Sequence, residues 1–150
     1  MTQRSRDEIE SAFMLYIDHT RYCAGSGNWS RWAELFTEDV RYYSNGVLIW
    51  NGREEVHAGV VEYYSEYPFN HVVDFALNWH VIDETSGRVV FALKVIMDDP
   101  GDGSTLSEDV LIHINFAGKG KWKLEEDYFN PDLFTRMAED WIEAKVNQTG

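Results

Sequence analysis

Three consecutive acids near the end of the chain, Glu125, Glu126 and Asp127, are the residues best placed to do chemistry. They end a predicted strand that begins at Lys121, and the aromatic pair Tyr128-Phe129 follows them. A strand that contributes only to packing seldom carries acids beside aromatic residues, so at least one acid should face the apolar side of the sheet. A carboxyl group in apolar surroundings has a raised pKa and can act as a general acid.

The alternation of side chains along this strand does not decide which acid faces inward. Strict alternation from Trp122 and Leu124 turns Glu126 inward and leaves Asp127 outside. A β-bulge after Leu124 turns Asp127 inward instead. The residues themselves leave both alternatives open.

Two further polar residues share the parity of predicted inward faces. His71 has the parity of Phe75 in the strand that follows it, and Glu108 has the parity of Ile112 in a later strand. A neutral imidazole can accept or donate a proton near neutral pH, and a carboxyl among apolar walls can donate one. We therefore predict that His71, Glu108 and Asp127 are catalytic.

Alternating apolar residues on three predicted strands form the walls of a pocket. The strands cover residues 73–81, 89–97 and 110–116. The predicted walls are Phe75, Leu77, Trp79, Phe91, Leu93, Val95 and Ile112. No Lys or Arg is among them, so we expect the ligand to be a small, uncharged, hydrophobic molecule.

Composition limits the possible partners. The chain of 150 residues carries 13 Lys and Arg against 26 Asp and Glu, a formal net charge of -13. This charge argues against nucleic acid and anionic membranes, both of which need clustered cations. Its length and 44% hydrophobic share predict a single folded domain over residues 1–150. The lone Cys23 and the lack of a signal-peptide core predict a cytoplasmic protein.

Helices come first in the predicted order of elements. A capping box formed by Ser5 and Glu8 starts a helix near Arg6. A later helix is predicted over residues 53–67, with Asn51 as its cap.

Strands follow, which predicts an α+β fold: a cone-shaped, curved antiparallel sheet wraps around the N-terminal helices and encloses a deep pocket. A final helix at about 131–145 closes the pocket or packs on a partner. The apolar residues Val90, Ala92, Ile96 and Leu111 lie on the back of the sheet. A monomer would leave them in water, so we predict a homodimer joined by this outer face.

Three segments resemble motifs of the nuclear-transport-factor-2-like superfamily, and especially of its SnoaL-like group. Residues 27–42 resemble its "gDw…lFaeDv.Y" segment, residues 52–56 its "GreaI" helix start, and residues 120–124 its "GkWki" final strand. The resemblance covers nearly the whole chain and implies a cone with a deep ligand pocket, often dimeric through the outer sheet face. The superfamily includes ketosteroid isomerase, scytalone dehydratase, limonene epoxide hydrolase, polyketide cyclases and modules without catalysis, so the fold does not determine the function.

Site residues can be matched to these enzymes one by one. The resemblance to limonene epoxide hydrolase implies an acid or base role for Asp127 and a water-positioning role for Tyr42, and the match supports an inward Asp127. His71 matches a histidine of scytalone dehydratase, and Tyr43 and Ser44 match positions that line the pocket. No catalytic set of these relatives is complete in this chain.

These features predict an enzyme that needs neither cofactor nor metal. It would be a lyase, isomerase or hydrolase acting by acid–base chemistry on a small hydrophobic ring compound, such as a terpenoid, steroid or polyketide. The histidines lack the spacing of metal ligands. The alternative is a ligand-binding or assembly module of the same fold without catalysis.

Overall fold

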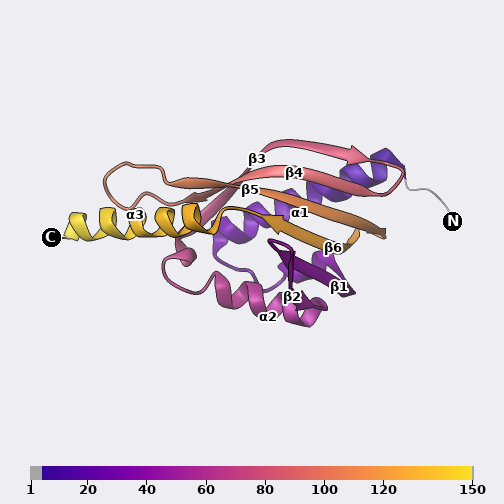
Figure 1. The fold of residues 1–150 in the computed structure, drawn as a ribbon, viewed down its shortest axis with the longest axis horizontal. Coiled ribbons are helices and arrows are strands. Elements are labelled where there is room, and N and C mark those ends of the chain that lie inside the picture. Colours follow the sequence, from indigo (N-terminus) through magenta and orange to yellow (C-terminus); the bar gives the residue numbers. More distant parts are fainter. Residues whose placement is uncertain (1–4, 150) are drawn as a thin grey trace.

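The computed structural model describes residues 5–149. Helices lead the chain and strands dominate its second half, as the sequence predicts (Figure 1). The helices are α1 (Arg6–Ser26), the short 3₁₀ helices η1 (Trp32–Leu35) and η2 (Phe69–His71), α2 (Arg53–Tyr63) and α3 (Pro131–Thr149). The strands are β1 (Phe36–Ser44), β2 (Val47–Asn51), β3 (Val72–Asp83), β4 (Arg88–Met97), β5 (Ser107–Gly118) and β6 (Lys121–Tyr128).

Helix α1 begins where the sequence predicts. Ser5 caps it by accepting a hydrogen bond from the Glu8 amide at 3.1 Å. Gly27 ends it with a φ of 73°, a left-handed conformation that favours glycine. The buried face of α1, which includes Phe13 and Tyr16, packs against the sheet.

Helix α2 is shorter than the predicted helix 53–67 and lacks the predicted cap. Asn51 belongs to β2, and Gly52 precedes the helix with a φ of 100° and no side-chain cap. The helix ends before Tyr64, whose ring stacks on Trp29 with centroids 4.1 Å apart. The stacking of Tyr64 on Trp29 thus takes the place of the last helical turn that we predicted.

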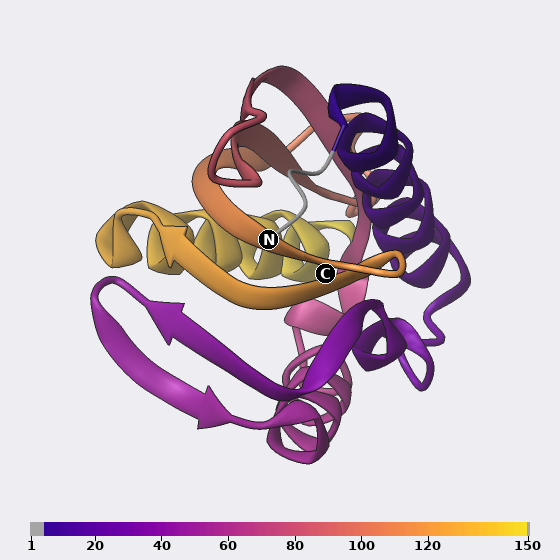
Figure 2. The same cartoon turned by 90° about the vertical axis from the view of Figure 1, so that its right-hand side faces the viewer.

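The strands form one sheet in the order β2-β1-β6-β5-β4-β3. Figure 2 shows this sheet curling into an open cone, with α1 along one side and α2 beside β1 and β2. The predicted α+β fold is confirmed, but the sheet is mixed because β1 and β6 run parallel. The predicted antiparallel pairing holds for the other four strand pairs, and only the β1–β6 pair departs from it. No hairpin joins the first and last strands, so no turn fixes their relative direction.

A β-bulge in β3 reverses the facing of the second half of that strand. The pairing with β4 shifts between Leu77 and Trp79. Trp79 is consequently 49% exposed on the outer surface. His80 turns inward instead and packs on Phe13, with ring centroids 4.9 Å apart. The regular alternation predicted for residues 73–81 fails at this bulge.

One hydrophobic core joins the helices to the inner face of the sheet. Helix α3 contributes Met137 and Trp141 to it, and extends beyond the predicted range of about 131–145. Figure 1 shows α3 projecting along the long axis of the molecule. Within residues 5–149, no helix combines the length and apolarity that crossing a bilayer requires.

The outer face of the sheet carries a row of apolar side chains across four strands. The register places Trp79, Ala92, Leu111 and Tyr128 side by side. Leu111 and Tyr128 are 40% and 42% exposed. These four residues, which we call the outer row, form an apolar strip on the outer face of the sheet.

We propose that two copies associate through the outer row, and we predict the effect of a charge placed within it. Leu111→Lys should weaken self-association at least about tenfold, because a lysine buried there would lack a partner. Sedimentation velocity over a concentration series measures this change. Leu15→Lys is the matched control, because Leu15 is 63% exposed on α1. A wild-type chain that stays monomeric at micromolar concentration would contradict the proposal.

Candidate active site

A bulge in β6 turns two acids toward the inside of the cone. Trp122 packs inward, but Lys123 is an extra residue that is skipped in the pairing with β5. Beyond this bulge, Glu125 and Asp127 line the pocket, whereas Glu126 lies on the outer face. The bulge comes earlier than we predicted. Of the two alternatives left open by the sequence, the structure selects Asp127, and it adds Glu125.

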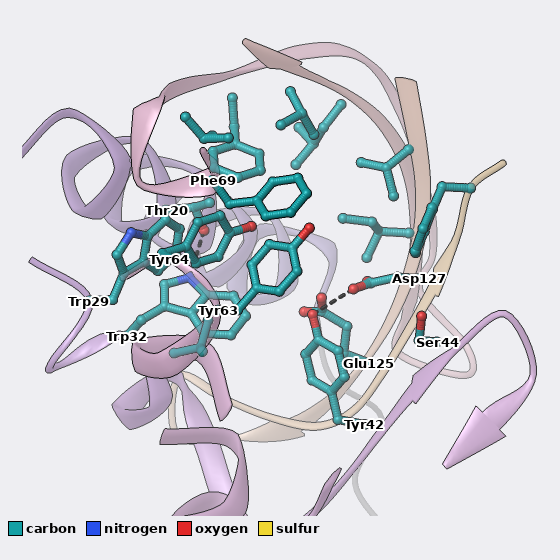
Figure 3. A pocket seen from close by; sticks show the side chains of 18 of the residues that line it. Thr20, Trp29, Trp32, Tyr42, Ser44, Tyr63, Tyr64, Phe69, Glu125 and Asp127 are labelled. Carbon is teal, nitrogen blue, oxygen red and sulfur yellow. Dashed lines mark hydrogen bonds between the residues drawn. The ribbon is translucent and has the colours of Figure 1, made fainter. Parts of the chain in front are cut away.

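Two tyrosines from different elements hold these carboxyl groups, and Figure 3 shows one of them, Tyr42, beside Glu125 and Asp127. Tyr16 of α1 donates a hydrogen bond to Glu125 Oε1 at 2.5 Å, and Tyr42 of β1 donates one to Asp127 Oδ2 at 2.5 Å. Glu125 is only 1% exposed. Helix α1, strand β1 and strand β6 therefore meet at one pair of acids.

The environment of the pair decides which acid holds a proton. Burial raises the pKa of Glu125 well above its usual range, and the nearby Asp127 raises it further. Burial also raises the pKa of Asp127, but hydrogen bonds from Glu125 and Tyr42 oppose that rise. We infer that a protonated Glu125 donates to an ionised Asp127, so that the pair carries one negative charge.

Both phenols that touch the pair remain donors. Burial raises the pKa of Tyr16 and Tyr42 well above the usual range, and the charges of Glu125 and Asp127 raise it further. Neither phenol therefore ionises near neutral pH.

The acid pair lies on the wall of a cavity of about 180 Å³. The aromatic residues that line it are Tyr16, Trp29, Trp32, Tyr42, Trp50, Tyr63, Tyr64, Phe69, Phe75, Phe129 and Phe134. Among the lining residues of the described chain there is no Lys, Arg or His, so no side-chain cation neutralises the pair. Over residues 5–149, no cluster of His, Cys, Asp and Glu has the geometry of a metal site.

Gly59 in α2 leaves room for the Trp50 ring, which forms part of the aromatic wall of the cavity. A Cβ atom at Gly59 would lie 2.1 Å from the Trp50 ring, so a larger residue there would displace that ring. Trp50 in turn packs on Tyr42, with ring centroids 4.8 Å apart. The close packing of α2 on β2 thus helps to position the phenol that donates to Asp127.

Comparison with known proteins identifies the fold of the chain. No family model and no curated protein matches the chain. Among solved structures, an NTF2-like protein from Anabaena variabilis ATCC 29413 is similar with a TM-score of 0.64 and 15% identity, over 87% of this chain and 95% of that one. The chain has the nuclear-transport-factor-2-like (NTF2-like) fold.

Two further similar structures carry names of enzymes. An LEH-like epoxide hydrolase from M. tuberculosis is similar with a TM-score of 0.67 and 12% identity, over 95% of this chain and 93% of that one. A putative SnoaL-like polyketide cyclase from Jannaschia sp. CCS1 has a TM-score of 0.65 and 13% identity, over 92% of this chain and 96% of that one. The predicted resemblance is confirmed at the level of the fold.

The NTF2-like cone brings part of the predicted site together. Tyr42, Ser44 and Asp127 line the pocket. Four of the predicted walls also line it: Phe75, Leu93, Val95 and Ile112. That Tyr42 and Asp127 act in catalysis stays a prediction.

His71 does not reach the pocket. A bulge at Val73 offsets it from the inward face of β3, so that Val72 lines the pocket in its place. The His71 ring packs on Trp141 of α3 with centroids 4.3 Å apart, and its Nδ1 lies 3.0 Å from Asp98 Oδ2. The structure therefore gives His71 a place in the contact between α3 and the sheet.

Glu108 also lies outside the pocket lining. It pairs across the sheet with Val95, and the pocket-lining part of β5 begins two residues later, at Val110. Phe134 and Met137 of α3 also line the cavity. Glu108 has the predicted parity but sits too near the start of β5.

Four other predicted lining residues face elsewhere. Tyr43 belongs to the opposite face of β1 from Tyr42, and the Arg41 guanidinium lies 5.5 Å from the centroid of its ring. Phe91 is fully buried against α1, with its centroid 5.6 Å from that of Tyr16. Leu77 and Trp79 lie at the β3 bulge and do not line the cavity.

Sequence reasoning missed Glu125 as a site residue. One signal could have found it: Glu125 has the same parity as Asp127, so a bulge that turns one inward turns both inward. Tyr16 lies on the buried face of α1, but nothing in the sequence pairs it with β6. Tyr63 and Tyr64 were expected inside a longer helix.

The raised pKa of Glu125 predicts a pH dependence of stability. The pKa of Glu125 is higher in the folded than in the unfolded chain. The contribution of Glu125 to the free energy of unfolding is therefore present below the pKa of the unfolded chain, and it is lost as the pH rises through the pKa of the folded chain. Glu125→Gln keeps the size of the side chain but cannot ionise. Its free energy of unfolding should therefore fall less than that of the wild type as the pH rises.

Urea unfolding at a series of pH values measures this difference. Glu108→Gln makes the same chemical change outside the pocket and should follow the wild type. Parallel curves for wild type and Glu125→Gln would show that Glu125 is not held protonated by the fold.

Proposed function

We propose that this protein is an enzyme that uses the Glu125–Asp127 pair for acid–base chemistry on a small hydrophobic ring compound. The observation that carries the proposal is the buried acid pair, held by two phenols on the wall of an apolar cavity. Burying two carboxyl groups costs stability unless they are paired and hydrogen-bonded. Such an arrangement is typical of sites in which environment shifts pKa values for proton transfer.

The two acids have different roles. Asp127, ionised and in contact with the cavity, accepts a proton from the substrate or from a water molecule beside it. Glu125 and Tyr42 donate to Asp127 and hold it in place. Once Asp127 is protonated, the pair is neutral and can return a proton to another atom of the substrate. This exchange suits an isomerase, a lyase or a hydrolase.

The size and charge of the cavity narrow the substrate class. A dry cavity of about 150 Å³ holds benzene, so a cavity of about 180 Å³ takes a compound with one ring better than a steroid. The single negative charge of the pair has no side-chain counter-ion in the described lining, so an anionic ligand would be repelled. An uncharged one-ring compound, such as a monocyclic terpenoid, fits both limits.

The alternative is a ligand-binding module without catalysis. It is favoured by the mutual contacts of the pair, since Glu125 and Asp127 already interact with each other and with Tyr16 and Tyr42. The enzyme is favoured by Asp127 Oδ1, which is buried and accepts no hydrogen bond from an N–H or phenol group of residues 5–149. A carboxylate has about four acceptor sites, so Asp127 can accept from Glu125 and Tyr42 and still accept a proton from a ligand.

Asp127→Asn tests the proposal on a panel of one-ring epoxides, allylic alcohols and unsaturated ketones, with products detected by mass spectrometry. On a substrate that the wild type converts, the variant should lose about 10²-fold or more in turnover, because its amide cannot accept the proton. Asp109→Asn is the matched control, since Asp109 pairs with Lys94 on the outside of β5. Near-native turnover by a folded Asp127→Asn would contradict the proposal, and binding without turnover by the wild type would favour the module.

A further inference from the structure

The acid pair leaves a negative charge in the cavity that no side chain of the described lining balances. Lys, Arg and His are all missing from the lining residues within 5–149. Asp127 is the ionised member of the pair, and its Oδ1 atom is buried and accepts no hydrogen bond from an N–H or phenol group of those residues. A buried charge is costly unless it is paired, so the cavity is suited to a ligand that brings the opposite charge.

Aromatic rings surround this charge. The Tyr42 phenol donates to Asp127, and the centroid of the Trp50 ring lies 4.8 Å from that of Tyr42. Figure 3 shows Tyr63 and Tyr64 on the other side of the cavity from Asp127. Burial raises the pKa of Tyr63 to about 12 and that of Tyr64 well above the usual range, and the charge of Asp127 adds to both rises. Both rings therefore lie within electrostatic reach of the carboxylate.

A carboxylate enclosed by aromatic rings favours an organic cation. The faces of aromatic rings attract ammonium groups, and the attraction is stronger where water is excluded. The low dielectric of the cavity likewise strengthens the attraction between the cation and the carboxylate. Folding has already removed Asp127 from water, so binding requires the desolvation of the ligand's charge alone.

A metal ion would not use these features. Over residues 5–149, no group of His, Cys, Asp and Glu has the geometry of a metal site. Hard metal cations take six or more oxygen ligands, whereas nearly half of the residues that line this cavity are aromatic. An ammonium group needs one acceptor, and the carbon skeleton attached to it can pack on the rings. The volume of about 180 Å³ leaves room for one ring.

We propose that the pocket binds a one-ring amine in its protonated form, with the ammonium group donating a hydrogen bond to Asp127 and the ring packed among the aromatic walls. This inference goes beyond the proposed function, because the substrate proposed there is uncharged. The amine would occupy the same cavity and would compete with that substrate. Its binding depends on the charge of Asp127 and not on turnover.

Benzylamine and benzyl alcohol are the probes, because they have the same shape and only the amine is a cation at neutral pH. Isothermal titration calorimetry should show that the wild type binds benzylammonium about tenfold more tightly, the difference between a charged and a neutral hydrogen bond. The titrations contain about 0.15 M salt, which screens exposed charges more than buried ones. The net charge of -13 therefore contributes little through cations held at the surface.

Two variants make the same chemical change at neighbouring acids. Asp127→Asn removes the charge and should abolish the preference for benzylammonium. It should keep the binding of benzyl alcohol, which shows that the variant pocket is intact. Glu125→Gln is the matched control, because its amide can still donate to Asp127 and leaves the charge in place. This variant should keep the preference.

The proposal would be overturned by equal binding of the two probes to the wild type, by a preference that survives Asp127→Asn, or by a preference that is lost in Glu125→Gln. Turnover of uncharged substrates is measured separately. A wild type that converts such a substrate without preferring benzylammonium would refute this inference and leave the proposed function standing. A preference without turnover would support the inference and count against the enzyme.

Discussion

Two carboxyl groups buried in one apolar cavity repel each other unless they share a proton, and the inner half of this structure depends on that condition. Glu125 is 1% exposed, yet it lies beside a second acid. Its proton removes one of the two charges, and the phenols of Tyr16 and Tyr42 stabilise what remains. If either phenol moved away, a buried oxygen would lose its donor.

This condition links elements that are far apart in the sequence. Tyr16 comes from the buried face of α1, Tyr42 from β1, and both acids from β6. The parallel pairing of β1 with β6 brings Tyr42 beside the acids, and the bulge at Lys123 turns them inward. The NTF2-like cone thus positions the pair, while the side chains of α2 and η2 close the apolar cavity around it.

The sequence predicted the fold class because its signals are local. A capping box, glycine turns and alternating strands define α1 and the sheet without any knowledge of contacts. The site depends on bulges, which local patterns do not reveal. One bulge moves Trp79 to the outside, a second moves His71 away from the pocket, and a third brings Glu125 inward with Asp127. Each shifts parity by one residue, so a prediction from parity fails beyond it.

Carbon-13 NMR of the side-chain carboxyl carbons of Glu125 and Asp127 over a pH range tests the central claim most directly. The prediction is that the Glu125 carbon keeps the chemical shift of a protonated carboxyl through neutral pH, while the Asp127 carbon shows an ionised carboxylate. If both carbons titrate independently at the values of exposed carboxyl groups, the pair shares no proton, and the proposed acid–base site is wrong.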